Sequence, residues 1–210
     1  MMFRNYRAGF GLALMIAVTA AIAACGSDSV TAPEERPASE LRLLTVASTS
    51  PLLATTTASF WAVKGKNAGV DLWYHARAGQ SDSTKFLEFR MGGATLDRRP
   101  DGSAIAEGDS VLITLTVVSP TNLIVDFQPS GLQFSTKDPA KLKMFFAACG
   151  DDLDRDGQVT SSDDAIEQQL SIWRQESAAS PWIKVSSLVV KNNKEIDAEL
   201  GGFTGYAIAY

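Results

Sequence analysis

The chain has 210 residues, and its 24 acidic residues outnumber 19 basic ones, which gives a net charge of −5. No basic cluster interrupts this acidic balance, so the composition argues against nucleic acid as a partner. Hydrophobic residues make up 45% of the chain. That share and this length are enough for one domain of ordinary size held by its own core.

The N-terminus has the pattern of a secretory signal. Arg4 and Arg7 form a basic beginning, and the apolar stretch from Phe10 to Val18 is followed by small residues. A membrane-spanning helix needs about 20 uninterrupted apolar residues, and this stretch gives way earlier to Thr and Ala. We therefore expect residues 1–24 to be a signal peptide that is removed from the mature protein.

The end of this signal resembles the bacterial lipobox, which is the run from Ile22 to Cys25 here. In that family the cysteine is acylated and becomes the first mature residue, so the resemblance implies lipidation of Cys25 and a lipid anchor in the bacterial cell envelope. Gly26 follows, as in lipoproteins that move to an outer membrane. Several acyl chains at one anchor exceed the roughly two signals that stable attachment requires. The alternative is an ordinary signal peptide with an incidental cysteine.

Residues 25–57 are rich in Ser, Thr, Ala and Pro. This composition predicts a disordered, flexible tether that lifts the domain off the lipid surface. Leu41 to Val46 has the residues of a short strand, and that alternative stays open. We expect the folded domain to occupy residues 58–210.

From residue 58 onward, short apolar and β-branched runs alternate with Gly, Pro and Asn turn signals. This spacing predicts an all-β fold, an antiparallel sandwich or barrel, and of the two we expect the β-sandwich. In the run SVLITLTVV, alternate residues give one fully apolar face, as a half-buried strand requires. Those residues are Val111, Ile113, Leu115 and Val117. The expected strands are FWAV, VDLWYHA, KFLEFRM, SVLITLTVV, LIVDFQP, KLKMFFAA, WIKVSSLVV, IDAEL and YAIAY.

One segment has helical spacing. Ile166, Leu170 and Trp173 fall at i, i+4 and i+7, which places them on one face of a helix. We therefore expect a short helix directly after an acidic loop.

Two turn motifs in the middle of the chain carry a family resemblance. The matching residues are Ser103, Ala104, Ile105 and Gly108 in the first motif, and Pro129, Gly131, Leu132, Phe134, Pro139, Leu142 and Met144 in the second. The pattern resembles the ZU domain, the β-sandwich of ankyrins, zonula-occludens proteins and netrin receptors. The resemblance covers Lys85 to Tyr210, although Asp101-Gly102-Ser103 replaces the usual Ile-Pro. It implies an interaction or scaffolding module.

The run DLDRDGQVTSSD, residues 152–163, has the spacing of an EF-hand calcium loop. Calcium takes six to eight oxygen ligands, and the glycine at position 6, Gly157, permits the sharp turn that brings them together. Asp at position 12 in place of Glu resembles the dockerin version of the loop, but dockerins carry two repeats, so no cohesin partner is implied. The expected ligands are Asp152, Asp154, Asp156, Gln158 through its backbone carbonyl, Thr160 and Asp163.

The alternative is a solvated acidic turn without a metal. Six carboxylates between Asp151 and Asp164 are offset by Arg155 alone, and each like-charge pair at 5–6 Å costs about 0.7 kcal/mol even in water. This repulsion favours a bound cation, so calcium is the expected cofactor. A lone loop predicts weak binding, with a Kd of about 10⁻⁴–10⁻³ M as in extracellular modules.

The remaining candidate residues favour no enzyme. His75 is the single histidine, so zinc and Ser-His-Asp sites lack partners. Some ZU-like domains cleave themselves at His-Phe-Ser, but here Gly202 replaces the histidine before Thr204. We expect Cys149 to be a small, buried hydrophobic residue at the end of a strand.

We therefore expect a non-enzymatic, lipid-anchored envelope lipoprotein with a structural calcium loop and with an envelope protein or glycan as partner. The alternative is an adhesin domain that binds carbohydrate or protein through exposed aromatic residues. A self-cleaving domain is the third reading. Exposed aromatics clustered on one sheet would favour the adhesin; the tryptophans are Trp61, Trp73, Trp173 and Trp182.

Overall fold

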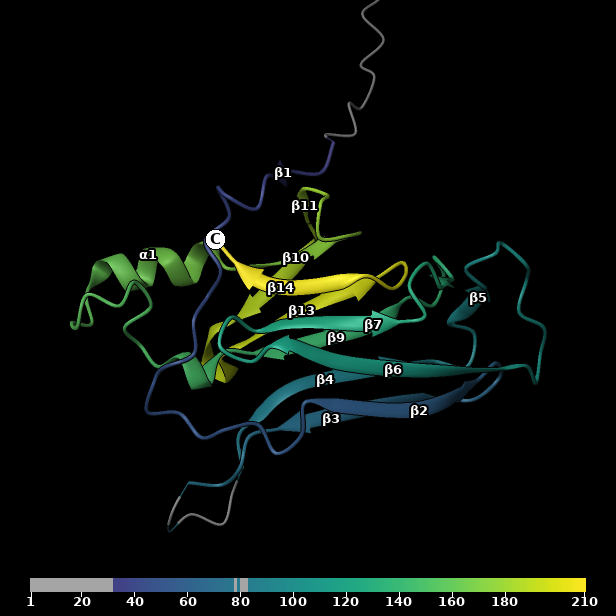
Figure 1. Ribbon diagram of the computed structural model, residues 1–210, viewed down its shortest axis with the longest axis horizontal. Helices are drawn as coiled ribbons and strands as arrows, with labels where there is room; N and C mark the ends of the chain where they lie inside the picture. Colours follow the sequence, from purple (N-terminus) through teal and green to yellow (C-terminus); the bar gives the residue numbers. More distant parts are fainter. Residues whose placement is uncertain (1–31, 78, 80–82) are drawn as a thin grey trace, which may run out of the picture. The chain divides into compact units, whose positions relative to one another are not determined.

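The computed structural model describes residues 32–77, 79 and 83–210 (Figure 1). The expected signal peptide and the expected lipidation site, Cys25, lie outside the described residues. Pro33 to Tyr210 form one compact unit. Within the described part of the chain, no helix has the length and apolar character needed to cross a bilayer.

The unit is built from two antiparallel sheets of seven and five strands, which Figure 1 shows one behind the other. The predicted all-β sandwich is therefore confirmed. The seven-stranded sheet runs β1 (Glu35–Arg36), β11 (Trp182–Lys184), β10 (Ser171–Gln175), β14 (Gly205–Ala209), β7 (Ile124–Gln128), β6 (Ser110–Ser119) and β2 (Thr57–Val63). The five-stranded sheet runs β12 (Ser187–Val190), β13 (Glu195–Leu200), β9 (Ala140–Phe145), β4 (Lys85–Met91) and β3 (Ala68–Trp73). A small third sheet pairs β5 (Leu96–Arg98) with β8 (Gln133–Phe134).

The core lies between the two large sheets and follows the predicted alternation. In β6 the four apolar residues of the predicted buried face are at most 8% exposed. Aromatic rings join the sheets at the centre. The ring of Phe127 in β7 stacks on Phe203 at 4.9 Å between centroids and lies 5.1 Å from Phe89 in β4. Each such pair adds about 0.5–1.5 kcal/mol beyond the area that it buries.

The structure differs from the expected tether between Pro33 and Thr56, a segment that we call the N-terminal strap. Leu44 is fully buried in the core, and its N–H donates to the carbonyl of Ile208 (3.0 Å). Leu41 is buried against the outer face of the seven-stranded sheet. The strap therefore belongs to the folded unit, and the open alternative of local order near Leu41 to Val46 is the better description.

The predicted helix forms, but it ends earlier than its spacing suggested. Helix α1 spans Ser161–Gln169, and Leu170 leaves the helix with φ −53° and ψ 138°. Trp173 is buried in β10 rather than on the helix. The spacing of Ile166, Leu170 and Trp173 therefore runs past the end of the helix into the strand that follows it. The described residues also include two 3-10 turns, η1 (Ala147–Cys149) and η2 (Lys191–Asn193).

Candidate metal site

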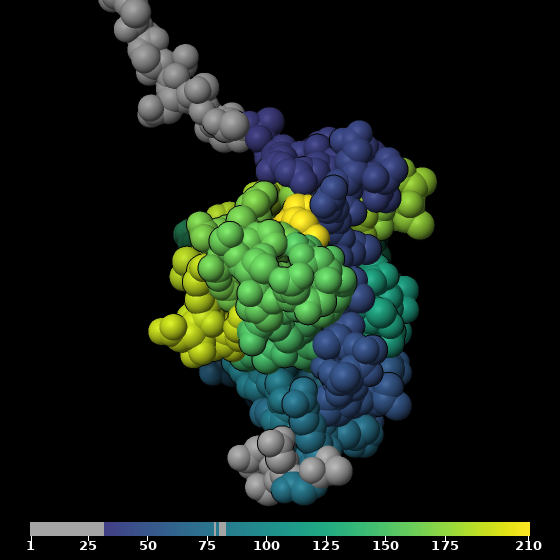
Figure 2. All heavy atoms as spheres, turned by 90° about the vertical axis from the view of Figure 1, so that its left-hand side faces the viewer, coloured from purple at the N-terminus to yellow at the C-terminus, as the bar shows by residue number. Residues whose placement is uncertain are grey.

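The acidic loop lies in the connection between the two sheets. The chain leaves β9 of the five-stranded sheet, passes through η1 and the loop, and enters α1 and then β10 of the seven-stranded sheet. Figure 2 looks onto this end of the molecule, where the green loop and helix lie beside the blue N-terminal strap. The path of the loop therefore bears on how the two sheets are joined.

Three carboxylates fold the loop through hydrogen bonds to main-chain N–H groups further along the chain. Asp152 Oδ2 accepts from the N–H of Gly157 (3.1 Å), Asp154 Oδ1 from that of Asp156 (3.1 Å), and Asp156 Oδ1 from that of Gln158 (2.8 Å). Gly157 has φ 91°, a conformation that glycine adopts at no steric cost. These turns bring the three carboxylates together, with one oxygen from each within 4.8 Å of the others.

Asp152 has a buried oxygen without a hydrogen bond within the described part of the chain. Asp152 Oδ1 is buried and has no hydrogen-bond partner among the described residues. A buried acceptor without a partner costs about 1–3 kcal/mol, and more when it carries charge. A cation bound at this oxygen of Asp152 would remove that cost.

Asp163 lies outside the group of three. Its side chain is buried, and its oxygens accept from the N–H groups of Leu153 (2.6 Å), Asp154 (3.3 Å) and Thr160 (2.8 Å). The hydrogen bond from the Thr160 N–H is the main reason that the pKa of Asp163 is lowered, and it outweighs the opposing effect of burial. In this structure Asp163 holds the loop against the start of α1.

The other two expected ligands are exposed. Thr160 begins α1 as its N-cap, because its hydroxyl accepts from the N–H of Ser162 (3.2 Å). Ser162 was not among the expected site residues, yet its hydroxyl donates to Asp154 Oδ2 (2.9 Å). The main-chain N–H of Gln158 donates to Asp156 Oδ1, as described above.

Basic side chains from a distant turn face the acidic segment, so Arg155 is not the only cation there. Lys194 Nζ lies 3.1 Å from carboxylate oxygens of both Asp151 and Glu167, and Lys191 lies 3.3 Å from Glu167. Burial opposes the charge of Lys194, but the two carboxylates outweigh it and raise its pKa. Sequence reasoning missed these lysines because they approach the loop only in the folded chain.

Arg155 ties the loop to the N-terminal strap. Its guanidinium donates to the carbonyl of Asp152 (2.6 Å) and to that of Thr45. Nearby, the N–H of Ala47 donates to the carbonyl of Ala148 in η1 (3.0 Å). The strap and the acidic connection therefore support each other.

The other candidate residues do not assemble a second site. His75 is exposed just after β3. The Thr204 hydroxyl is buried and donates to the carbonyl of Gln175, so it is held by the main chain. Burial raises the pKa of the Cys149 thiol to about 12. A thiol of that kind stays protonated at neutral pH and is a poor nucleophile.

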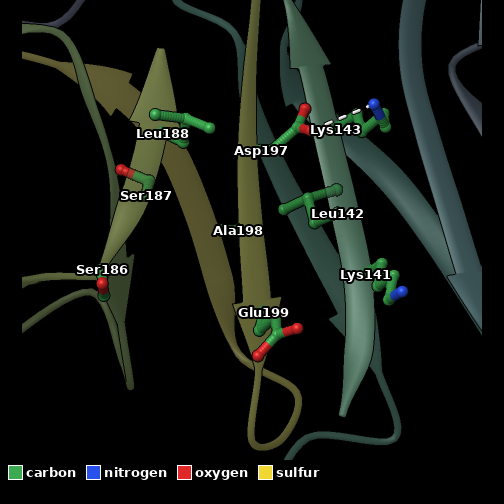
Figure 3. Close-up of a pocket in the computed structure, with 9 residues that line it drawn as sticks. All are labelled: Lys141, Leu142, Lys143, Ser186, Ser187, Leu188, Asp197, Ala198 and Glu199. Carbon is green, nitrogen blue, oxygen red and sulfur yellow. Dashed lines mark ion pairs between the residues drawn. The ribbon is translucent and has the colours of Figure 1, made fainter. Parts of the chain in front are cut away.

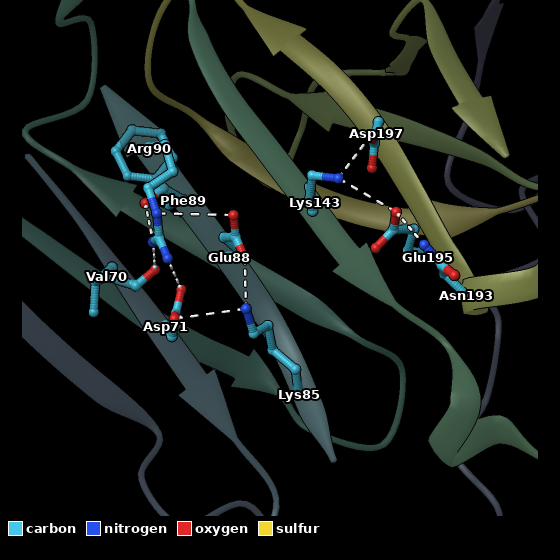
Figure 4. A network of polar contacts seen from close by, with 10 residues as sticks. All are labelled: Val70, Asp71, Lys85, Glu88, Phe89, Arg90, Lys143, Asn193, Glu195 and Asp197. Atoms are coloured by element: carbon cyan, nitrogen blue, oxygen red, sulfur yellow. Dashed lines mark hydrogen bonds and ion pairs between the residues drawn. The ribbon is translucent and has the colours of Figure 1, made fainter. Parts of the chain in front are cut away.

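The outer face of the five-stranded sheet carries paired charges (Figure 4). Arg90 in β4 lies 2.7 Å from Asp71 in β3, and Lys143 in β9 lies 3.0 Å from Asp197 and 3.3 Å from Glu195 in β13. Because opposite charges alternate across the strands, few of them remain without a partner. This face is suited to contact with water.

A shallow hollow lies at one side of this face, over β9, β13 and β12 (Figure 3). The ion pair between Lys143 and Asp197 borders it, and Leu188 in β12 stands beside it, 65% exposed. The polar side chains that line the hollow are those of Lys141, Lys143, Ser186, Ser187, Asp197 and Glu199.

The fold and the loop together define a mostly β, two-sheet domain with an acidic cluster suited to a hard cation. In comparisons with protein-family models, curated proteins and solved structures, the chain matches none. No family is therefore identified.

Proposed function

We propose that this protein is a non-enzymatic cell-envelope lipoprotein whose β-sandwich is stabilised by calcium bound at the acidic loop. Two observations carry the proposal: Asp152, Asp154 and Asp156 bring one carboxylate oxygen each within 4.8 Å of the others, and Asp152 has a buried oxygen without a hydrogen-bond partner among the described residues. Carboxylate oxygens are the ligands that calcium prefers, and the EF-hand spacing adds a backbone carbonyl at position 7, Gln158.

Calcium at this position would act on the fold through the loop. The metal would offset the repulsion among the three carboxylates and fix the path between the two sheets. Asp163 accepts hydrogen bonds from the N–H groups of Leu153 in the loop and Thr160 at the start of α1, so a fixed loop would also fix the start of the helix. The role that follows is structural, and the chemistry of the loop supplies no reaction step.

The envelope part of the proposal rests on sequence. The lipobox-like run from Ile22 to Cys25 supports acylation and an outer-membrane location, and the two-sheet sandwich is compatible with a ZU-like interaction or scaffolding module. Intact mass of the purified chain checks the anchor: acyl groups should be present on the natural chain and absent from Cys25→Ser. An unmodified natural chain would contradict the anchor and leave the calcium proposal standing.

The adhesin alternative, which would bind an envelope protein or a glycan, draws less support from the side chains. Trp61 in β2 is 64% exposed and Trp73 in β3 is 38% exposed, but the two belong to different sheets. Trp173 and Trp182 are buried. The exposed indoles therefore form no shared aromatic platform.

Calcium titration tests the proposal. At a calcium concentration of about ten times Kd, binding to the folded state alone adds about 1.4 kcal/mol. For a chain of this size that raises the melting temperature by about 3–6 °C. We expect this rise relative to chelator, with a binding heat in calorimetry, and we expect magnesium to produce a smaller rise because it prefers a rigid octahedral site.

Two substitutions of equal charge separate the metal from general electrostatics. Asp152→Asn should abolish the calcium-dependent rise, because position 1 of the EF-hand pattern requires Asp and the change removes a converging carboxylate. Asp164→Asn is the matched control, because Asp164 is an exposed residue of the first turn of α1 outside the cluster. It should keep the rise. An equal rise in both variants, or no rise in the natural chain at millimolar calcium, would contradict a calcium site here.

A further inference from the structure

The large sheets end in four edge strands, β1 and β2 in one sheet and β12 and β3 in the other. Three of them have features that protect an edge from pairing with another chain. Strand β1 has two residues and β12 has four, and β3 carries Asp71 and an irregular register after Leu72. Strand β2 differs, with seven residues that include no charge and no proline and keep an unbroken register with β6.

The hydrogen bonds of β2 show which of its groups face the open edge. The N–H of Val117 donates to the carbonyl of Thr56 (2.7 Å), and the N–H of Lys64 donates to the carbonyl of Asp109 (2.9 Å). Antiparallel strands bond through alternate residues, so the even-numbered residues of β2 bond to β6. The odd-numbered residues therefore direct their N–H and C=O groups away from the sheet.

The chain itself closes both ends of this edge. The Thr55 hydroxyl donates to the carbonyl of Thr57 (2.8 Å) and accepts from the N–H of Thr57 (3.3 Å). At the other end, the carbonyl of Val63 accepts a hydrogen bond from the N–H of Lys66 (3.0 Å), while no described residue accepts from the N–H of Val63. Ser59 and Trp61 remain, and no described residue bonds their outward main-chain groups. Ser59 and Trp61 are therefore the residues of this edge whose outward N–H and C=O groups are both open.

The side chains beside this edge are uncharged and partly apolar. Trp61 is 64% exposed and lies opposite Leu112 of β6, which is 45% exposed. The hydroxyls of Ser59 and Thr114 bond each other at 2.8 Å. This surface contrasts with the charged outer face of the five-stranded sheet, and a strand that paired here would meet no unpaired charge.

We propose that β2 is a self-pairing edge, to which a second copy of this chain adds its own β2 in antiparallel orientation. A two-fold axis at Phe60 places Ser59 of each copy opposite Trp61 of the other. Every outward N–H and C=O group of both residues then meets a free partner, while the bonded groups of Thr57 and the bonded carbonyl of Val63 mark the ends of the pairing. A second copy is favoured because β2 carries no charge, so two copies of this edge meet without the repulsion between like charges that a charged edge would give.

The contact is small, so the dimer should be weak and concentration-dependent. It joins two seven-stranded sheets into one continuous sheet and leaves the acidic loop outside the contact. The proposal therefore stands or falls independently of calcium binding and of the lipid anchor.

Sedimentation over a range of concentrations tests the proposal on the full chain carrying Cys25→Ser, in which no acyl group can hold copies together. We expect a monomer–dimer equilibrium. Adding Ser59→Lys and Trp61→Lys together should weaken the dimer by about tenfold or more, because lysines then face lysines at two places. The matched control is Val118→Lys with Leu188→Lys, at positions 62% and 65% exposed, which should dimerise like the parent.

A charge-reversed variant shows whether the two edges face each other. Ser59→Glu with Trp61→Glu should also be monomeric alone, and an equimolar mixture with the double-lysine variant should form a heterodimer. Melting curves confirm that each variant is folded. A parent chain that stays monomeric overturns the proposal and leaves the edge to a strand of another protein. Unchanged dimerisation of the double-lysine variant also overturns it.

Discussion

Two buried tyrosines, Tyr74 and Tyr206, differ in the hydrogen bonding of their hydroxyl groups. The Tyr206 hydroxyl donates to the carbonyl of Gly202 (2.6 Å), whereas the Tyr74 hydroxyl is buried and has no hydrogen-bond partner among the described residues. Burial raises the pKa of both hydroxyls. The two side chains therefore bury similar area but differ in how well their polar atom is satisfied.

This difference gives opposite expectations for the same substitution. Tyr206→Phe should lower the free energy of unfolding by about 1 kcal/mol, because it removes a hydrogen bond and leaves a carbonyl behind. Tyr74→Phe should be neutral or stabilising by up to about 1 kcal/mol, because it removes a polar atom without a partner. Urea unfolding measures both. Equal losses in the two variants would show that Tyr74 has a partner in solution.

At the candidate site, the spacing of the sequence predicted part of the arrangement. The convergence of Asp152, Asp154 and Asp156 follows from local turns, which the spacing encodes. The contacts of Lys194 depend on the fold, since that residue is far from the loop in sequence. Asp163 was expected as a ligand, but its short side chain also fits the N–H groups of the helix start, and spacing alone does not choose between these roles.

At the scale of elements, the N-terminal strap shows how a composition can mislead. Its Ser, Thr, Ala and Pro content is typical of a tether, but a few leucines decide its place. Leu44 packs fully in the core, while Leu52 in the same strap is 82% exposed. Alternation within the strands predicted most of the sandwich, because each strand carries its own pattern. The strap carries too short a pattern to be recognised without its partners.

The strap makes a clear prediction with a control in the same segment. Leu44→Ala should lower the free energy of unfolding by about 2–5 kcal/mol, as expected for a leucine lost from a packed core. Leu52→Ala should change it by less than about 0.5 kcal/mol, as expected for an exposed position. Urea unfolding of the two variants checks this. A Leu44→Ala chain as stable as the natural one would contradict the packing of the strap into the core and would favour the expected flexible tether.

At the scale of the whole molecule, groups with shifted pKa values set the pH range of stability. The carboxylates of Glu88 and Asp163 have lowered pKa values, mainly from hydrogen bonds to Lys85 and to the Thr160 N–H respectively. A lowered folded pKa gives stability that is present above the unfolded pKa, about 4, and is lost as pH falls through the folded value. The acid limit should therefore lie below about pH 4.

The alkaline side depends on groups that the fold keeps neutral. Burial raises the pKa of Cys149 to about 12 and also raises that of Tyr74 and Tyr206. Unfolded thiols and phenols ionise near about pH 8.5 and 10. Because the folded values are higher, this stability is complete below the unfolded pKa values and is lost as pH rises toward the folded ones.

We therefore expect the free energy of unfolding to be nearly constant from about pH 5 to 8 and to fall steadily from about pH 9 upward. Tyr74 follows β3, Tyr206 lies in β14 and Cys149 lies in the connection between the sheets, so the loss should affect the sandwich as one cooperative unit. Urea unfolding at a series of pH values measures it. Tyr74→Phe should make the alkaline decline shallower, because one ionising group is gone, and a curve that stays flat to about pH 11 would contradict the burial of these groups.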